Sequence, residues 1–213
     1  IVGSIEVGAE IDDEVRRQGL LEKDIVLGTA LVDMYCKCGL LEKAREVFEK
    51  LPKRNVVTWS ALIAGYAQNG LGDEALKCFK LMQSEGISPN AVTFICILQC
   101  CASVRAIEEG QRIHEEVMNR GLLEKDIALG NALVHMYCKC GLLAKAKEVL
   151  EQLPMQSAVS WNTLIAGYAQ NGLGHEALTC FSQMKNAKVC PDVVTYICIL
   201  KACGMVGSLK IGE

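Results

Sequence analysis

The stretch that decides the fold is residues 56–90, which read VVTWSALIAGYAQNGLGDEALKCFKLMQSEGISPN. Apolar residues recur at helical spacing until Asn69-Gly70, a pair that commonly ends a helix. A second apolar helical pattern follows and stops before Gly86. The stretch therefore predicts two consecutive helices joined by a tight turn.

The same pattern returns along the chain with a period of 102 residues. When the sequence is shifted by 102, 63 of the 111 compared positions are identical. The period subdivides because openings such as Val57-Thr58-Trp59 recur within it. The predicted units, in one continuous solenoid, are a partial long repeat with its second helix (1–24), a short repeat (25–55), a standard repeat (56–90), a long repeat (91–126), a short repeat (127–157), a standard repeat (158–192) and a partial long repeat (193–213).

Repeated helix pairs of this kind stack, because one pair alone cannot bury its apolar face. Signals for β-hairpins do not interrupt the pattern. We therefore predict an all-α fold, a right-handed αα-solenoid of helix-turn-helix repeats. The units end on small polar residues that suit the cap of the next helix, namely Asn55, Asn90, Asp126, Ser157 and Asp192.

Composition excludes several classes of protein. Of the 213 residues, 51% are hydrophobic and 22% are charged, which is not the composition of a disordered tail. The net charge of −3 excludes a polycation that holds nucleic acid by charge alone. Apolar runs are too short to predict a membrane span. The first residues resemble neither a signal peptide nor a transit peptide, so we expect either no targeting segment or an internal piece of a longer chain.

Cysteine, histidine and glycine are interpreted as structural residues. Ten of the twelve cysteines recur at the 102-residue spacing, which favours small core residues over a disulfide or zinc site and predicts a reducing compartment. The three histidines replace aspartates of the first copy and are interpreted as surface positions, and the glycines as turn residues. We predict no catalytic residue, no metal and no cofactor, and therefore not an enzyme.

The Val-Thr/Ser-aromatic openings, the LIAGYAQNG blocks, the Glu-Ala-Leu helices and the unit lengths of 31, 35 and 36 residues resemble the pentatricopeptide repeat family. The mixed lengths are similar to its plant-type PLS variant, whereas tetratricopeptide repeats would keep one length of about 34 residues. The resemblance implies binding of single-stranded RNA, about one base per repeat. In the family, two polar side chains per unit select the base, and apolar residues near the helix starts hold its faces.

Carried onto this sequence, the resemblance implies base-selecting pairs in four units: Thr29 with Asn55, Ser60 with Asn90, Asn131 with Ser157, and Asn162 with Asp192. The family's pairing rule assigns them adenine, adenine, cytosine and uracil. The long unit offers Ile95 and Asp126, and an aliphatic side chain cannot hydrogen-bond a base edge. With RNA running 5′ to 3′ along the chain, the expected target is A-A-n-C-U.

An internal comparison supports this reading edge. All four selector positions differ between the two copies, although most compared positions are identical. A code on a repeated scaffold would produce this pattern. The alternative is that helix starts and loops simply tolerate polar exchanges.

Two further sets of residues are candidates for RNA contact. The resemblance implies that base faces are held by Val26, Val57, Val92, Ala128, Val159 and Val194. The alternative for these residues is packing between repeats. Lys37 and Lys139 end the first helices of the short units, where they could neutralise phosphate or only complement the helix dipole.

The resemblance extends to plant organellar editing factors. It implies the target-recognition part of a C-to-U RNA editing factor in a mitochondrion or chloroplast, with single-stranded RNA and an organellar editing cofactor protein or deaminase domain as partners, and no membrane. Uncapped repeat ends predict self-association. The alternative is a protein-binding helical scaffold, including one that docks an editing cofactor protein through the long repeats.

Overall fold

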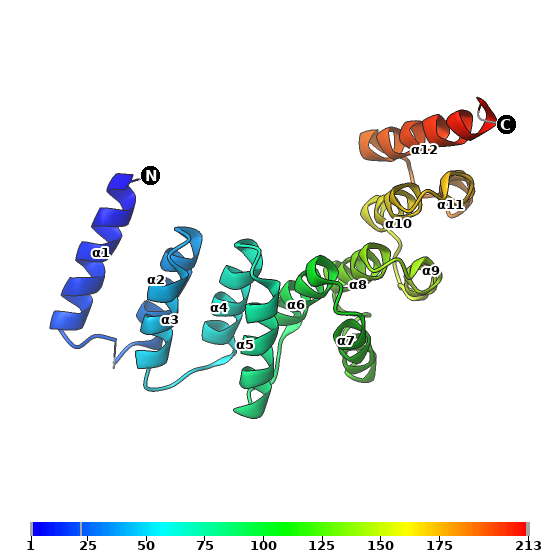
Figure 1. Cartoon of the computed structure of the whole chain (residues 1–213). Coiled ribbons are helices and arrows are strands. Elements are labelled where there is room, and N and C mark those ends of the chain that lie inside the picture. The colour runs from blue at the N-terminus through cyan, green and yellow to red at the C-terminus, as the bar shows by residue number, and fades with distance from the viewer. Residues whose placement is uncertain (1, 22, 212–213) are drawn as a thin grey trace. The chain divides into compact units, whose positions relative to one another are not determined.

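The computed structural model describes residues 2–21 and 23–211, which form twelve helices and no strand (Figure 1). The prediction of an all-α fold of consecutive helix pairs is confirmed. The helices are α1 (Val2–Arg17), α2 (Ile25–Lys37), α3 (Leu41–Lys50), α4 (Val56–Gln68), α5 (Gly72–Ser84), α6 (Ala91–Val104), α7 (Ile107–Asn119), α8 (Ile127–Lys139), α9 (Leu143–Gln152), α10 (Ala158–Gln170), α11 (Gly174–Asn186) and α12 (Val193–Ile211).

The chain divides into two compact units, Ile1–Cys100 and Cys101–Glu213, with the boundary inside α6. In the first unit α2 packs beside α4, and α3 and α5 pack against them. In the second unit α8, α10 and α12 pack in sequence, with α9 and α11 against them. The prediction of one continuous solenoid stays a prediction. Over the residues that the structure describes, no helix has the length and apolar character needed to cross a membrane.

Each unit has its own aromatic and aliphatic core. In the first unit the aromatic residue of the opening, Trp59, is fully buried, and its ring meets that of Phe48 edge-on at 4.6 Å between centroids. Ile63, one turn further along α4, is also fully buried. Burial of each such side chain stabilises the fold by about 2–3 kcal/mol. The helical periodicity read from the sequence is therefore the periodicity of the core.

Neighbouring first helices approach closely because one of them carries a glycine. A methyl group on Gly65 would overlap the thiol of Cys36, and one on Gly167 would overlap the thiol of Cys138. The interpretation of glycines as turn residues is right at Gly70, whose φ is 76°. It is wrong at Gly65 and Gly167, which lie inside helices where the small thiol of the neighbour fills the space.

The twelve cysteines are free thiols. Burial raises the pKa of Cys36 to about 11 and that of Cys138 to about 12, as expected for inert core residues. The core interpretation is wrong for Cys203, which is exposed on α12. Among the described residues, no group of three or more His, Cys, Asp or Glu could hold a metal ion.

Two of the positions interpreted as surface sites are partners of buried tyrosines. The hydroxyl of Tyr35 donates to Asp12 at 2.8 Å, and Asp12 is only 6% exposed and also paired with Arg16. At the equivalent place in the second copy, Tyr137 lies 2.9 Å from Nδ1 of His114. The Asp-to-His exchange therefore preserves a hydrogen bond to an interior hydroxyl, which a surface interpretation does not explain.

Candidate nucleic-acid interface

The last residue of each repeat caps the first helix of the next, as predicted. Asn55 Oδ1 accepts hydrogen bonds from the backbone of Val57 at 2.9 Å and Thr58 at 3.0 Å. Asn90 Oδ1 accepts one from the backbone of Thr93 at 2.9 Å. Caps of this kind stabilise a helix by about 1 kcal/mol. Because Oδ1 faces the helix, Nδ2 of each asparagine is directed away from it and offers two donors.

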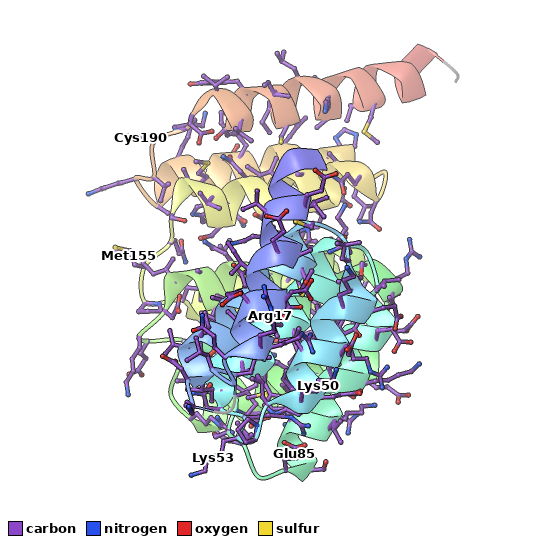
Figure 2. All side chains as sticks on the ribbon, turned by 90° about the vertical axis from the view of Figure 1, so that its left-hand side faces the viewer. Arg17, Lys50, Lys53, Glu85, Met155 and Cys190 are labelled. Carbon is purple, nitrogen blue, oxygen red and sulfur yellow. The ribbon has the colours of Figure 1, made fainter. Side chains whose placement is uncertain are left out.

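The loops that carry these caps share an edge within each unit. In the second unit Met155 and Cys190 lie in the loops before α10 and α12, and Figure 2 shows both at the same edge. The caps Ser157 and Asp192 follow each of them by two residues. In the first unit, Lys53 of the loop before α4 and Glu85 at the end of α5 also lie near one edge in this view.

A buried hydroxyl joins the two members of each selector pair in the first unit. Thr93 is fully buried, and its Oγ1 lies 2.6 Å from Ser60 Oγ and donates to Asn90 Oδ1 at 2.9 Å. Thr58 Oγ1 likewise lies 3.1 Å from both Thr29 Oγ1 and Asn55 Oδ1, but the Thr29 hydroxyl donates its proton to the Ile25 carbonyl at 2.7 Å. Each pair therefore meets at the third residue of the following repeat.

The second unit repeats the arrangement with different selectors. Thr195, fully buried, donates through Oγ1 to Asn162 Oδ1 at 2.6 Å and lies 3.0 Å from Asp192 Oδ1. Asn162 Nδ2 also donates directly to Asp192 Oδ1 at 2.9 Å. The equivalent contacts, 2.7 Å from Ser160 Oγ to the asparagine Oδ1 and 2.9 Å between the two serine hydroxyls, link Asn131, Ser160 and Ser157.

These hydrogen bonds decide which selector is a donor and which is an acceptor in the first unit. A hydroxyl has one proton, and Thr93 donates its proton to Asn90. Ser60 therefore donates to Thr93, and its lone pairs remain as acceptors. Asn90 offers the donors of Nδ2. The first unit thus presents an acceptor on the helix and a donor on the cap.

The order is reversed in the second unit. Asn162 Oδ1 is occupied by Thr195, so its second Nδ2 proton remains as a donor. Hydrogen bonds from the Thr195 backbone and then from Asn162 lower the pKa of Asp192. Asp192 therefore stays ionised at neutral pH, with Oδ2 as an acceptor. The second unit presents a donor on the helix and an acceptor on the cap.

The helix selectors are less exposed to solvent than polar side chains on a helix surface. Ser60 is 6% exposed and Asn162 is 7% exposed, because the hydroxyl of the next repeat packs against each of them. Thr29 and Asn131 are half-buried. Three of the caps, Asn55, Asn90 and Asp192, are exposed, and Ser157 is half-buried.

Exposed valines flank these selectors in a groove on each unit. In the first unit a groove of about 500 Å³ is lined by Val26, Val57 and Val92 together with Thr29, Asn55 and Ser60. In the second unit a groove of about 380 Å³ is lined by Val159 and Val194 with Asn162, Asp192 and Lys139. The five valines are 53–73% exposed and Ala128 is also exposed. The alternative of packing between repeats is therefore wrong for these side chains.

The two lysines differ in their surroundings. Lys37 Nζ lies 2.6 Å from Asp33, and this hydrogen-bonded ion pair raises the pKa of Lys37. Lys139 instead donates to the neutral amide of Gln170 at 3.2 Å. The place of Asp33 is taken by His135, whose pKa is lowered by burial and by Lys139, so it is neutral at pH 7. Positive charge at the groove is thus stronger in the second unit.

Sequence reasoning missed the bridging hydroxyls. The sequence marks four of them only as members of the Val-Thr/Ser-aromatic openings, namely Thr58, Thr93, Ser160 and Thr195. A signal for them was present in the sequence. After every unit with a polar helix selector, the third residue of the next unit carries a hydroxyl, whereas Leu129 has this position after the long unit that carries Ile95.

Comparison with known proteins identifies the repeats. The model of the PPR repeat family matches residues 54–103 and 156–205, and that of the single PPR repeat matches residues 29–56 and 131–156. Together they cover more than half of the chain. The chain therefore belongs to the pentatricopeptide repeat family.

Its relatives include long plant proteins. A putative mitochondrial pentatricopeptide repeat-containing protein of Arabidopsis thaliana is 42% identical over 183 residues, 85% of this chain and 29% of that protein. The chloroplastic protein CRR2 of the same plant is 39% identical over 214 residues, 100% of this chain and 32% of that protein. The chain thus spans about a third or less of the length of these relatives.

Solved structures share the fold. Maize PPR10 superposes with a TM-score of 0.69 at 26% identity, over 85% of this chain and 27% of PPR10. PPR10 in complex with an 18-nt psaJ RNA element superposes with a TM-score of 0.71 at 22% identity, over 94% of this chain and 30% of PPR10.

Proposed function

We propose that this chain binds single-stranded RNA and reads one base at each of its four complete junctions between repeats. The observation that carries the proposal is the pairing, at each junction, of one unused hydrogen-bond donor and one unused acceptor around a buried hydroxyl. Exposed valines flank these pairs in both grooves. The structure of PPR10 with bound RNA, which has the same fold, supports the proposal.

The first unit suits adenine. The Watson–Crick edge of adenine has an amino donor at N6 next to an acceptor at N1. Ser60 supplies the acceptor and Asn90 the donor. Thr29, whose proton goes to the Ile25 carbonyl, is likewise an acceptor beside the donor Asn55. Single-stranded bases are read along this edge, because it is not engaged in pairing.

The second unit suits pyrimidines. Uracil presents a carbonyl acceptor beside the N3–H donor, which match the donor Asn162 and the acceptor Asp192. Cytosine presents the N3 acceptor beside its N4 amino donor, which match Asn131 and a lone pair of Ser157. The resulting target is A-A-n-C-U. No base is proposed for Ile95 and Asp126, which lie in separate units.

Affinity is expected to be modest. Aromatic stacking contributes about 1–3 kcal/mol per base, and aliphatic valines contribute less. The net charge is −3, and Lys37 is already paired with Asp33. We therefore expect a shallow dependence of binding on salt, because few counterions are released.

Several relatives are named mitochondrial or chloroplastic, which supports an organellar location for this chain. We propose that the chain is of the PLS type and is the target-recognition part of an organellar C-to-U editing factor. In that role it places a cytidine for a deaminase domain or partner. Exposed apolar residues on α1 (Val7, Ile11) and α12 (Ile197, Leu200) are where further repeats or a second copy would pack.

A gel-shift experiment tests the RNA-binding proposal. The probes are a longer single-stranded RNA that contains A-A-n-C-U, the same RNA with these bases permuted, and the first RNA annealed to its complement. We expect tightest binding to the first probe and loss of binding when the bases are paired. Equal binding to the first two probes would contradict base reading, and a chain that binds none of the three would favour a protein-binding scaffold.

A further inference from the structure

We propose that the buried hydroxyls of Thr58, Thr93, Ser160 and Thr195 are positioning residues that hold each selector pair in one hydrogen-bonding arrangement. The proposal rests on the proposed function, since it concerns how the same junctions read a base. None of the four touches a base in this account. Each acts through the two selectors that it joins.

The geometry places every one of these hydroxyls between both selectors. All four side chains are fully buried, so their hydroxyl protons are shared with neighbouring side chains and not with bulk water. The oxygen-to-selector distances in the four junctions lie between 2.6 and 3.1 Å, within hydrogen-bonding range. A single group therefore contacts both halves of each reading pair.

Three of these hydroxyls also take part in the helix caps, because Thr93, Ser160 and Thr195 accept hydrogen bonds from the backbone N–H groups of the cap residues at 3.3, 3.3 and 3.0 Å. A cap nevertheless forms at the long repeat without such a hydroxyl. Asp126 caps α8 through hydrogen bonds from the backbone of Ala128 at 2.9 Å and Leu129 at 3.3 Å. Leu129 occupies the place that the hydroxyl takes at the four junctions, and the cap forms without it. The preceding long unit carries Ile95, a selector that needs no orientation. The hydroxyl thus supports the cap but is not required for one, and it is present wherever the preceding unit carries a polar helix selector.

The two copies support the same conclusion. Thr58 and Ser160 are equivalent positions 102 residues apart, and the exchange keeps the hydroxyl while it drops a methyl group. Their helix selectors change from Thr29 to Asn131. The hydroxyl is therefore retained where the selectors vary, as a shared positioning group would be.

The physical role is clearest for Asn131. An asparagine amide has an acceptor on one side and donors on the other, and the two exchange when the group rotates by half a turn. Ser160 Oγ donates to Asn131 Oδ1 at 2.7 Å and so holds the oxygen inward and Nδ2 outward. Without this donor, both orientations become available, and the junction no longer distinguishes an acceptor on the base from a donor.

The test is substitution of Ser160 in the full chain, with binding measured to four RNAs that differ only at the cytosine of A-A-n-C-U. The wild-type protein should prefer cytosine by about 5- to 150-fold, the range of a two-bond base contact. Ser160→Ala should reduce this preference to about twofold or less while the preferences at the other three positions remain. Ser160→Thr, which restores the hydroxyl, should retain the preference for cytosine.

Two controls separate positioning from stability. Ser182→Ala removes an exposed hydroxyl on α11 that bonds only the helix carbonyl of Leu178, and it should change no preference. NMR of the Asn131 side-chain amide gives a readout without RNA: one fixed orientation in the wild type and two averaged orientations in Ser160→Ala. A cytosine preference that survives in Ser160→Ala would overturn the inference, and so would an equal loss of affinity for all four RNAs. A wild-type chain without preference at any position would overturn the proposed function first, and this inference with it.

Discussion

The two units of the molecule are built alike, but their selector pairs have opposite hydrogen-bonding polarity. Both place a buried hydroxyl between a helix residue and a cap residue, and both flank the pair with exposed valines. In the first unit the helix residue is a hydroxyl acceptor and the cap is an asparagine donor. In the second unit the helix residue is an asparagine donor and the cap is an acceptor. Exchange of two side chains around a constant group is therefore enough to reverse the hydrogen-bonding pattern.

The units also differ in the charge beside the groove. Asp33 neutralises Lys37 in the first unit, whereas His135 takes this place beside Lys139 in the second. The cores differ less, since Tyr35 and Tyr137 are buried and hydrogen-bonded in both. The two units therefore differ mainly in the side chains at the proposed reading edge, whereas their buried cores are similar.

The largest expected effect comes from converting a junction of the first unit into one of the second. In the double variant Ser60→Asn, Asn90→Asp the helix residue becomes a donor and the cap an acceptor. The second base should change from adenine to uracil, each preference being about 5- to 150-fold. Fluorescence anisotropy with RNAs varied at this base measures the change, and the other three positions serve as the control. Retention of adenine would show that polarity is not set by the selectors.

A single substitution should create a junction of a third kind. Asn162→Thr replaces a donor with a hydroxyl whose proton goes to Thr195, so an acceptor stands beside the acceptor Asp192. Guanine offers two adjacent donors, N1–H and N2–H, and should replace uracil by a factor of about 10. Competition binding with the four bases at that position checks the result. A variant that still selects uracil would show that Asn162 is not the residue that contacts this base.

The close approach of first helices should be needed equally in both units. Gly65→Ala drives a methyl group into the thiol of Cys36, and Gly167→Ala does the same at Cys138. Each should lower the free energy of unfolding by about 1–3 kcal/mol, measured by urea denaturation. Gly204→Ala is the matched control, because a methyl group there meets no atom within 4 Å apart from its chain neighbours and the backbone of its own helix. If the control loses as much as the other two, helix packing is not the cause.

Alkaline pH should weaken both units. Burial, with the hydrogen bond to Asp12 at Tyr35, raises the pKa of Tyr35 and of Tyr137 to about 12. Unfolded tyrosine titrates at about 10. The folded state therefore holds its protons longer, and its stability falls as pH rises from about 10 to 12, by on the order of 1 kcal/mol per pH unit for each tyrosine.

Denaturation at several pH values measures this slope. The double variant Tyr35→Phe, Tyr137→Phe should show a smaller slope above pH 10, although it is less stable overall. An unchanged slope would mean that other groups, such as the buried thiols, account for alkaline unfolding.

The smallest expected effect concerns charge. Exchange of the acidic neighbour between units, Asp33→His or His135→Asp, should raise or lower RNA affinity by about twofold, because one charge near a phosphate in water is worth about 0.5 kcal/mol. The effect should shrink in high salt. Salt titrations of RNA binding by both variants measure this effect. If both variants change RNA affinity equally and in the same direction, Asp33 and His135 do not set the charge available at Lys37 and Lys139.

Much of this structure follows from periodicity. Helix positions can be predicted because apolar residues repeat every 3–4 residues. Caps such as Asn55 can be predicted because few residue types accept hydrogen bonds from free backbone N–H groups. The roles of Asp12 and Gly65 could not be predicted from the sequence, because they depend on atoms of a neighbouring helix. The bridge through Thr93 has the same origin: its partners Ser60 and Asn90 are brought together only by packing of successive repeats.

Selection of bound RNAs from a random single-stranded pool tests the central claim most directly. We expect enriched sequences with two adenines at the bases of the first unit, then one unspecified base, then cytosine and uracil at the bases of the second. Pyrimidines at the first two positions and purines at the last two, or a pool that remains random, would contradict it.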